Sequence, residues 1–89
     1  LTPVAAHDCN GPVVLSASVH FCQATPNAFV QEIVRAFYYG WYAEIVTELP
    51  PIVDGAISAP EGPGLGMELL TDFKVRESTI SRTTRYQMT

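Results

Sequence analysis

The sequence predicts an α/β fold built on one strand–helix–strand unit of a parallel sheet. Two short apolar runs, Val4–Ala6 and Ala28–Gln31, flank a longer apolar segment over residues 13–24. A polar loop joins the first run to this segment, and a Thr-Pro-Asn turn joins the segment to the second run. Parallel strands need a crossover connection of a dozen or more residues, usually a helix, and this spacing supplies one.

The first strand stops before the polar loop 7–12, which is rich in turn-forming residues. Asn10 is placed to cap the following helix, and Pro12 suits its first turn. Residues 13–24 are apolar on nearly every side, so we expect other parts of the protein to cover this helix. Pro26 ends it.

The second half of the chain contains less regular structure. Residues 33–49 are rich in aromatic side chains, with one or two helical turns expected around residues 42–47, and we interpret the aromatic residues as core or interface packing. Two prolines then break the chain, and residues 52–57 predict a hairpin that turns at Asp54 and Gly55. Residues 60–66 predict a stiff loop without regular structure, and the remainder is undecided.

Composition predicts that much apolar surface is covered by a partner or by the rest of a larger fold. The 89 residues are 47% hydrophobic but only 16% charged, whereas globular domains average roughly 25% charged residues. Residues 1–6 do not resemble a secretory signal, and we interpret Leu1 as a processed or truncated start. The net charge of −4 argues against nucleic acid or an anionic membrane as the main partner.

Other compositional features bear on the compartment. No apolar stretch approaches the ~18 residues of a membrane-spanning helix. The two cysteines, Cys9 and Cys22, are too few for a disulfide scaffold, and we expect free thiols in a reducing cytoplasm.

His7 and Glu32 are the candidate catalytic residues, because each directly follows a predicted strand. In parallel βα architectures catalytic groups lie at the C-terminal ends of strands, and neighbouring strands would place these two side chains at one rim. A histidine there can exchange protons near neutral pH, and a protonated carboxyl group can donate a hydrogen bond to a developing anion. The alternative is a polar loop histidine beside a solvated strand end.

Two further patterns are candidates for sites. The pairs His7-x-Cys9 and His20-x-Cys22 offer four zinc ligands, but the spacing is uncommon, and residues two apart on a helix point in different directions. The glycine-rich run 62–66 lacks the lysine and the spacing of a phosphate-binding loop, which favours a tight turn.

Several short motifs occur in a specific order along residues 4–68. They are His7-Asp8-Cys9-Asn10-Gly11-Pro12-Val13, Ala24-Thr25-Pro26-Asn27, Gln31-Glu32, Asp54-Gly55 and Pro63-Gly64-Leu65-Gly66-Met67-Glu68. This order resembles the C-terminal third of the mandelate racemase and muconate lactonizing branch of the enolase superfamily, and it is most similar to sugar-acid dehydratases such as galactonate dehydratase. Ala6 stands where the family commonly has proline, and the tail after Leu70 matches less well.

The resemblance implies the C-terminal part of a modified TIM barrel, with Val4–Ala6 as its seventh strand and Ala28–Gln31 as its eighth. Residues 1–49 would form the barrel portion, and residues 50–89 would pack on a capping domain. His7 would be the general base, and Glu32 would hydrogen-bond the substrate carboxylate or the enediolate.

The implied activity is that of a Mg²⁺-dependent dehydratase acting on an acid sugar. The base removes the proton next to a carboxylate, Mg²⁺ stabilises the enediolate, and a β-hydroxyl group leaves. The metal would be bound by residues outside this chain, so we expect the 89 residues alone to be inactive. The complete enzyme is expected to be cytoplasmic and homo-oligomeric. Two alternatives remain: a racemase of the same superfamily, or a non-catalytic module that joins a partner or itself.

Overall fold

The computed structural model describes residues 2–77 and 79–85. It confirms the α/β class and gives the elements in the order β1 (Val4–Ala6), α1 (Pro12–Ala24), β2 (Ala28–Gln31), α2 (Arg35–Tyr38), the 3-10 turn η1 (Trp41–Glu44), β3 (Ile52–Val53), β4 (Ala56–Ile57) and the 3-10 turn η2 (Phe73–Val75).

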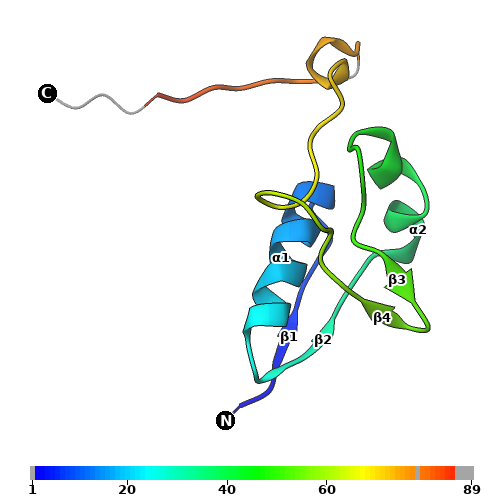
Figure 1. Cartoon of the computed structure of the whole chain (residues 1–89). Coiled ribbons are helices and arrows are strands. Elements are labelled where there is room, and N and C mark those ends of the chain that lie inside the picture. Colours follow the sequence, from blue (N-terminus) through cyan, green and yellow to red (C-terminus); the bar gives the residue numbers. More distant parts are fainter. Residues whose placement is uncertain (1, 78, 86–89) are drawn as a thin grey trace, which may run out of the picture.

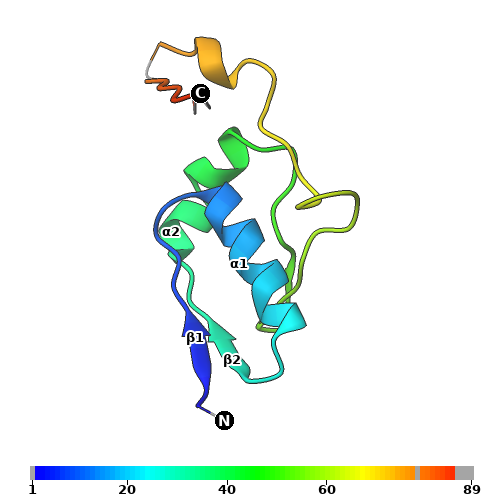
Figure 2. The same cartoon turned by 90° about the vertical axis from the view of Figure 1, so that its left-hand side faces the viewer.

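Strands β1 and β2 pair in parallel, and α1 is the crossover between them, as the sequence predicted (Figure 1). The helix runs alongside the two strands when the molecule is turned by 90° (Figure 2). Ala6 is paired with Gln31, and the Glu32 N–H donates to the carbonyl oxygen of Ala6 at 2.8 Å. The ladder therefore extends to the last residue of each strand.

Helix α1 begins at Pro12, the residue that the sequence placed in its first turn, and the prediction that Asn10 caps it is wrong. Gly11 occupies the N-cap position with φ 150°, and Pro12 is the first helical residue. Asn10 instead accepts a hydrogen bond from the Cys9 thiol through its side-chain oxygen at 3.4 Å. Glycine adopts this backbone conformation without a Cβ penalty, so the cap position moves to residue 11.

The core forms between one face of α1 and the aromatic segment that follows β2. Leu15 and Val19 of α1 are buried against Tyr38 and Tyr42. The Tyr42 ring also packs edge-on against Trp41, with ring centroids 4.7 Å apart. The interpretation of the aromatic cluster as core packing holds for these two tyrosines.

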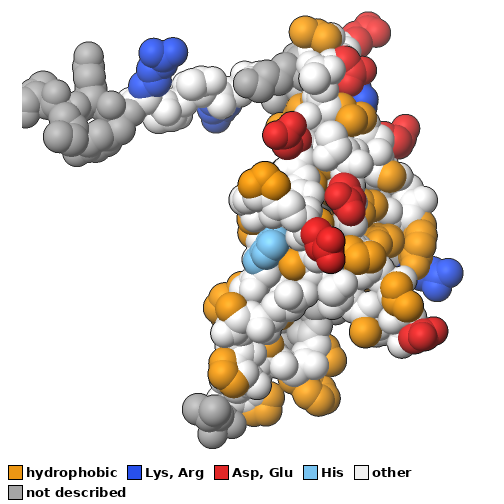
Figure 3. Space-filling view, viewed as in Figure 1, with side chains coloured by type: hydrophobic (Ala, Val, Ile, Leu, Met, Phe, Trp, Pro, Cys, Tyr) orange, Lys and Arg blue, Asp and Glu red, His pale blue; other side chains and the backbone are white. Residues whose placement is uncertain are grey.

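Much apolar surface stays open in the described part of the chain. The exposed group includes side chains on the outer face of α1 and on β2: Val13, Val14, Phe21, Phe29 and Val30. Figure 3 shows apolar side chains spread over this view, including its lower end, where the strands lie. The sequence predicted that other parts of the protein cover α1, and the described residues do not cover this outer face of the helix.

The helical turns predicted around residues 42–47 are displaced towards the N-terminus. Helical structure occurs at Arg35–Tyr38 and at Trp41–Glu44, and Val46 instead forms an antiparallel bridge with Leu69. The Thr47 N–H donates to the Glu68 carbonyl, and the Ile45 carbonyl accepts from Leu70. This part of the backbone is thus bonded to a distant strand-like segment, which local helix propensity cannot reveal.

The predicted hairpin is confirmed, since β3 and β4 pair in an antiparallel manner across Asp54 and Gly55. Both turn residues have positive φ, 50° and 77°, as a two-residue turn of this kind requires. The loop 60–66 lacks helix and strand, as predicted, and it is tied to α1 by a contact of 2.9 Å between His20 Nε2 and the Leu65 carbonyl oxygen. None of the helices within residues 2–77 and 79–85 has the length and apolar character that a bilayer crossing requires.

We expect Gly66→Ala to destabilise the protein more than Gly64→Ala. Both glycines have positive φ, so either alanine strains the backbone by about 1–2 kcal/mol. A Cβ at position 66 would also lie 2.6 Å from the Pro60 carbonyl oxygen, whereas position 64 has nothing within 4 Å. Chemical unfolding followed by circular dichroism should show an additional loss of about 1–3 kcal/mol at position 66. Equal losses would contradict the steric argument.

Candidate active site

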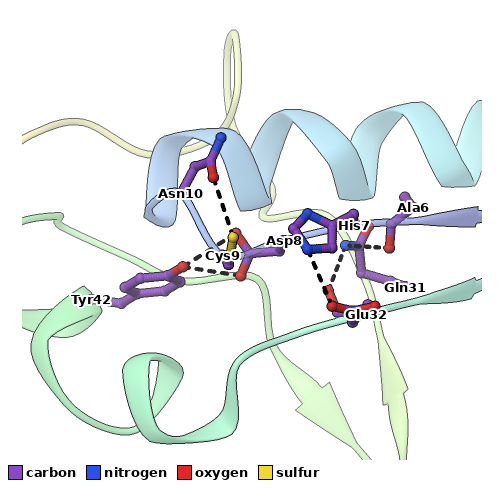
Figure 4. Close-up of polar contacts among 8 residues, drawn as sticks. All are labelled: Ala6, His7, Asp8, Cys9, Asn10, Gln31, Glu32 and Tyr42. Atoms are coloured by element: carbon purple, nitrogen blue, oxygen red, sulfur yellow. Dashed lines mark hydrogen bonds and ion pairs between the residues drawn. The ribbon is translucent and has the colours of Figure 1, made fainter.

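His7 and Glu32 lie side by side at the ends of the two parallel strands (Figure 4). Each is the first residue after its strand, and the Nε2 atom of His7 is 3.4 Å from Oε1 of Glu32. The backbone bond from Glu32 to Ala6 sets this proximity, because it fixes the strand ends at one level. The structure therefore brings together the two residues that the sequence singled out, while their catalytic role remains a prediction.

The pair is open to solvent. The side chain of His7 is 65% exposed and that of Glu32 is 59% exposed. Alternation along the strands explains the position, because Gln31 faces α1 and the next residue turns to the opposite face of the sheet. A ligand approaching the face away from α1 can reach both side chains.

Gln31 connects the two strand ends to the helix. Its side-chain nitrogen donates to the carbonyl oxygens of Ala6 and Glu32, at 3.4 and 2.8 Å. Its side-chain oxygen accepts from the Ser18 hydroxyl of α1 at 2.8 Å. Sequence reasoning used Gln31 only as part of a motif, although a long amide at the end of a strand next to a crossover helix was a signal for such a contact.

Asp8 and Tyr42 form a buried polar pair directly behind His7. Both residues are fully buried, and the Tyr42 hydroxyl donates to the Asp8 carboxylate, with oxygen–oxygen distances of 3.2 and 3.0 Å. Burial and the acceptor Asp8 together raise the pKa of Tyr42 to about 12. Sequence reasoning missed this pair, because Asp8 lies in a run of turn formers and its partner follows 34 residues later.

The side chains considered as zinc ligands have separate partners. His7 contacts Glu32, His20 contacts the Leu65 carbonyl, and Cys22 contacts Gln31. Throughout residues 2–77 and 79–85, no three His, Cys, Asp or Glu side chains gather as a metal would require. The residues in these two ranges therefore do not form a Mg²⁺ or Zn²⁺ site of their own.

In βα enzymes the catalytic groups lie at the C-terminal ends of parallel strands, which is the position of His7 and Glu32 in this structure. The chain belongs to the enolase C-terminal domain-like family, whose match covers residues 2–73. The domain of this family is a TIM-barrel-like α/β fold, which confirms the fold that the resemblance implied.

Two curated relatives carry different activities. D-xylonate dehydratase of Haloferax volcanii is 36% identical over 79% of this chain and 17% of its own length. Muconate cycloisomerase 1 of Rhodococcus opacus is 37% identical over 75% of this chain and 18% of its own length. The chain thus spans less than a fifth of either relative.

Solved structures give the same assignment. An enolase of the mandelate racemase subgroup from Agrobacterium tumefaciens is 52% identical, with a TM-score of 0.71 over 82% of this chain and 19% of that one. An enolase protein from the environmental genome of the Sargasso Sea is 40% identical, with a TM-score of 0.76 over 93% of this chain and 22% of that one. The relatives therefore include both dehydratase and isomerase-type enzymes, and enzymes of the superfamily generally use Mg²⁺.

We expect Tyr42→Phe to weaken the dependence of stability on alkaline pH. The pKa of Tyr42 is raised from 10.0 to about 12, so the folded state holds a proton that the unfolded state has lost. The contribution of the protonated Tyr42 hydroxyl to the free energy of unfolding is fully present below pH 10 and is lost as the pH rises towards about 12. The total loss is roughly 2–3 kcal/mol. Urea unfolding between pH 8 and about 12 measures it, and an identical pH slope in both proteins would refute the assignment. Burial also raises the pKa of Tyr38, which is present in both proteins and cancels in the comparison.

Proposed function

We propose that this chain supplies the general base and an acidic partner of an enzyme that removes the proton next to the carboxylate of an acid sugar and then eliminates water. The observation that carries the proposal is the 3.4 Å contact between His7 and Glu32 at the strand ends of an enolase-family domain. The identity of 36% to a D-xylonate dehydratase favours a sugar acid as the substrate class.

In this proposal His7 takes the proton from the substrate carbon through a neutral imidazole nitrogen. Imidazole suits this role because its charge changes near neutral pH. Glu32 faces the same open side and hydrogen-bonds the substrate carboxylate or the enediolate that replaces it. The β-hydroxyl then accepts a proton and leaves as water, and the resulting enol loses its hydroxyl proton and gains a proton at C3 to give a 2-keto-3-deoxy acid.

Mg²⁺ would be bound by residues outside this chain, because the described residues do not gather a metal-ligand cluster. When bound, the metal stabilises negative charge on the substrate carboxylate. The part of the chemistry that we assign to these residues is proton transfer at His7 and orientation at Glu32.

A racemase or cycloisomerase is the second candidate, favoured by the similarity to muconate cycloisomerase 1 and to the mandelate racemase subgroup. The racemase reaction shares removal of the α-proton with the dehydratase reaction and differs in the fate of the enediolate. The third candidate, a non-catalytic interaction module, draws support from the exposed apolar side chains.

We further propose a homo-oligomeric, cytoplasmic enzyme. The free thiols of Cys9 and Cys22 agree with a reducing compartment.

We expect His7→Asn in the full-length enzyme to lower the exchange of the substrate α-proton by about 10²–10⁴-fold, the usual contribution of a general base. Incubation of aldonic and aldaric acids with enzyme and Mg²⁺ in D₂O, followed by ¹H NMR, measures the exchange. Formation of a 2-keto-3-deoxy acid identifies a dehydratase, and incorporation of deuterium at the α-carbon with inversion of its configuration identifies a racemase.

His20→Asn is the matched control, because the ring nitrogen of His20 contacts the Leu65 carbonyl and the residue is not part of the pair at the strand ends. It should keep its exchange rate. Glu32→Gln should slow turnover, whereas Glu48→Gln, at an exposed position, should not. Unchanged exchange in His7→Asn would rule out this residue as the base.

A further inference from the structure

We propose that Tyr42 is a positioning residue for the reaction, which holds His7 in place by anchoring Asp8. This inference rests on the proposed function of His7 as the base. It concerns the buried hydroxyl of Tyr42, which lies on the closed side of the loop and does not contact the substrate-facing pair.

The first step is the contrast between neighbouring residues. The His7 side chain is 65% exposed, whereas Asp8 is fully buried. The Asp8 side chain is thus held on the inner side of the loop, and the side chain of the residue before it lies on the outer side. Figure 4 shows Asp8 directed towards Tyr42, while His7 meets Glu32 on the other side.

The second step is the strength of the anchor. A buried carboxylate without a donor is costly, which makes the hydrogen bond from Tyr42 hard to release. The Tyr42 hydroxyl therefore holds the loop at Asp8, the residue that directly follows His7.

The third step is the rigidity of the residue that supplies the hydroxyl. The Tyr42 ring lies in the core with Leu15 and Val19 of α1. His7 itself is held by a contact of 3.4 Å to a largely exposed carboxylate. Its orientation consequently depends on the backbone of the loop, and a displacement of about 1 Å can cost a proton transfer as much as 10²-fold in rate.

The test is Tyr42→Phe in the full-length enzyme, which removes one oxygen atom and keeps the buried ring. We expect kcat for α-proton exchange to fall by about 10- to 100-fold with KM nearly unchanged, at a temperature at which the variant is folded. Tyr38→Phe is the matched control, since it removes another buried hydroxyl, bonded to the Pro50 carbonyl at 2.6 Å. It should lose stability and keep its kcat.

A second set of variants separates positioning from general destabilisation. Asp8→Asn retains an oxygen acceptor for Tyr42 and should keep more of kcat than Asp8→Ala. In a His7→Asn background, Tyr42→Phe should not lower the residual exchange rate further, because Tyr42 acts through His7. A purely structural role would reduce the rate in both backgrounds.

The outcomes are distinguishable. Normal kcat in Tyr42→Phe, or an equal loss of kcat in Tyr38→Phe, overturns the positioning role while His7 remains the base. If Tyr42→Phe does not fold, equal kcat values for Asp8→Asn and Asp8→Ala overturn it. Normal exchange in His7→Asn defeats the proposed function, and the positioning role with it.

Discussion

The parallel ladder between β1 and β2 is the constraint on which the candidate site depends. Its final hydrogen bond, from the Glu32 N–H to the Ala6 carbonyl, places the first residues beyond both strands at the same level. A parallel pair cannot be closed by a tight turn, so α1 is required to bring the second strand back beside the first. The proximity of His7 and Glu32 is therefore a consequence of backbone topology, to which their own contact adds little, because exposed ion pairs contribute little stability.

Two polar side chains connect this backbone arrangement to the rest of the structure. Gln31 reaches both strand ends from the side of the helix, and Asp8 reaches into the core behind the loop. Buried polar groups are tolerated when hydrogen-bonded, and such contacts specify one arrangement where apolar packing alone would permit several. The open pair on one face and the buried pair on the other thus depend on the same short loop.

The sequence was sufficient to predict the strands and the candidate pair, because these depend on local patterns. Apolar runs bounded by turn formers predicted Val4–Ala6 and Ala28–Gln31, and the strand-end rule then selected His7 and Glu32. The Asp8–Tyr42 contact could not be found in this way, since it joins residues 34 positions apart. The helical turns near residue 45 were misplaced for the same reason, because hydrogen bonds in that segment are made with residues 68–70.

The exposure of the pair has a consequence for the chemistry. Water surrounds an imidazole that is 65% exposed, and electrostatic stabilisation of a developing anion is weak in water and strong in a dry site. The proton abstraction that we propose therefore requires that further polypeptide cover the face on which His7 and Glu32 lie. Phe29 and Val30 are exposed on β2, the strand that ends at Glu32, and the chain spans less than a fifth of its curated relatives. Additional chain packed against the strands would cover the apolar side chains exposed on β2. The same chain would also exclude water from His7 and Glu32.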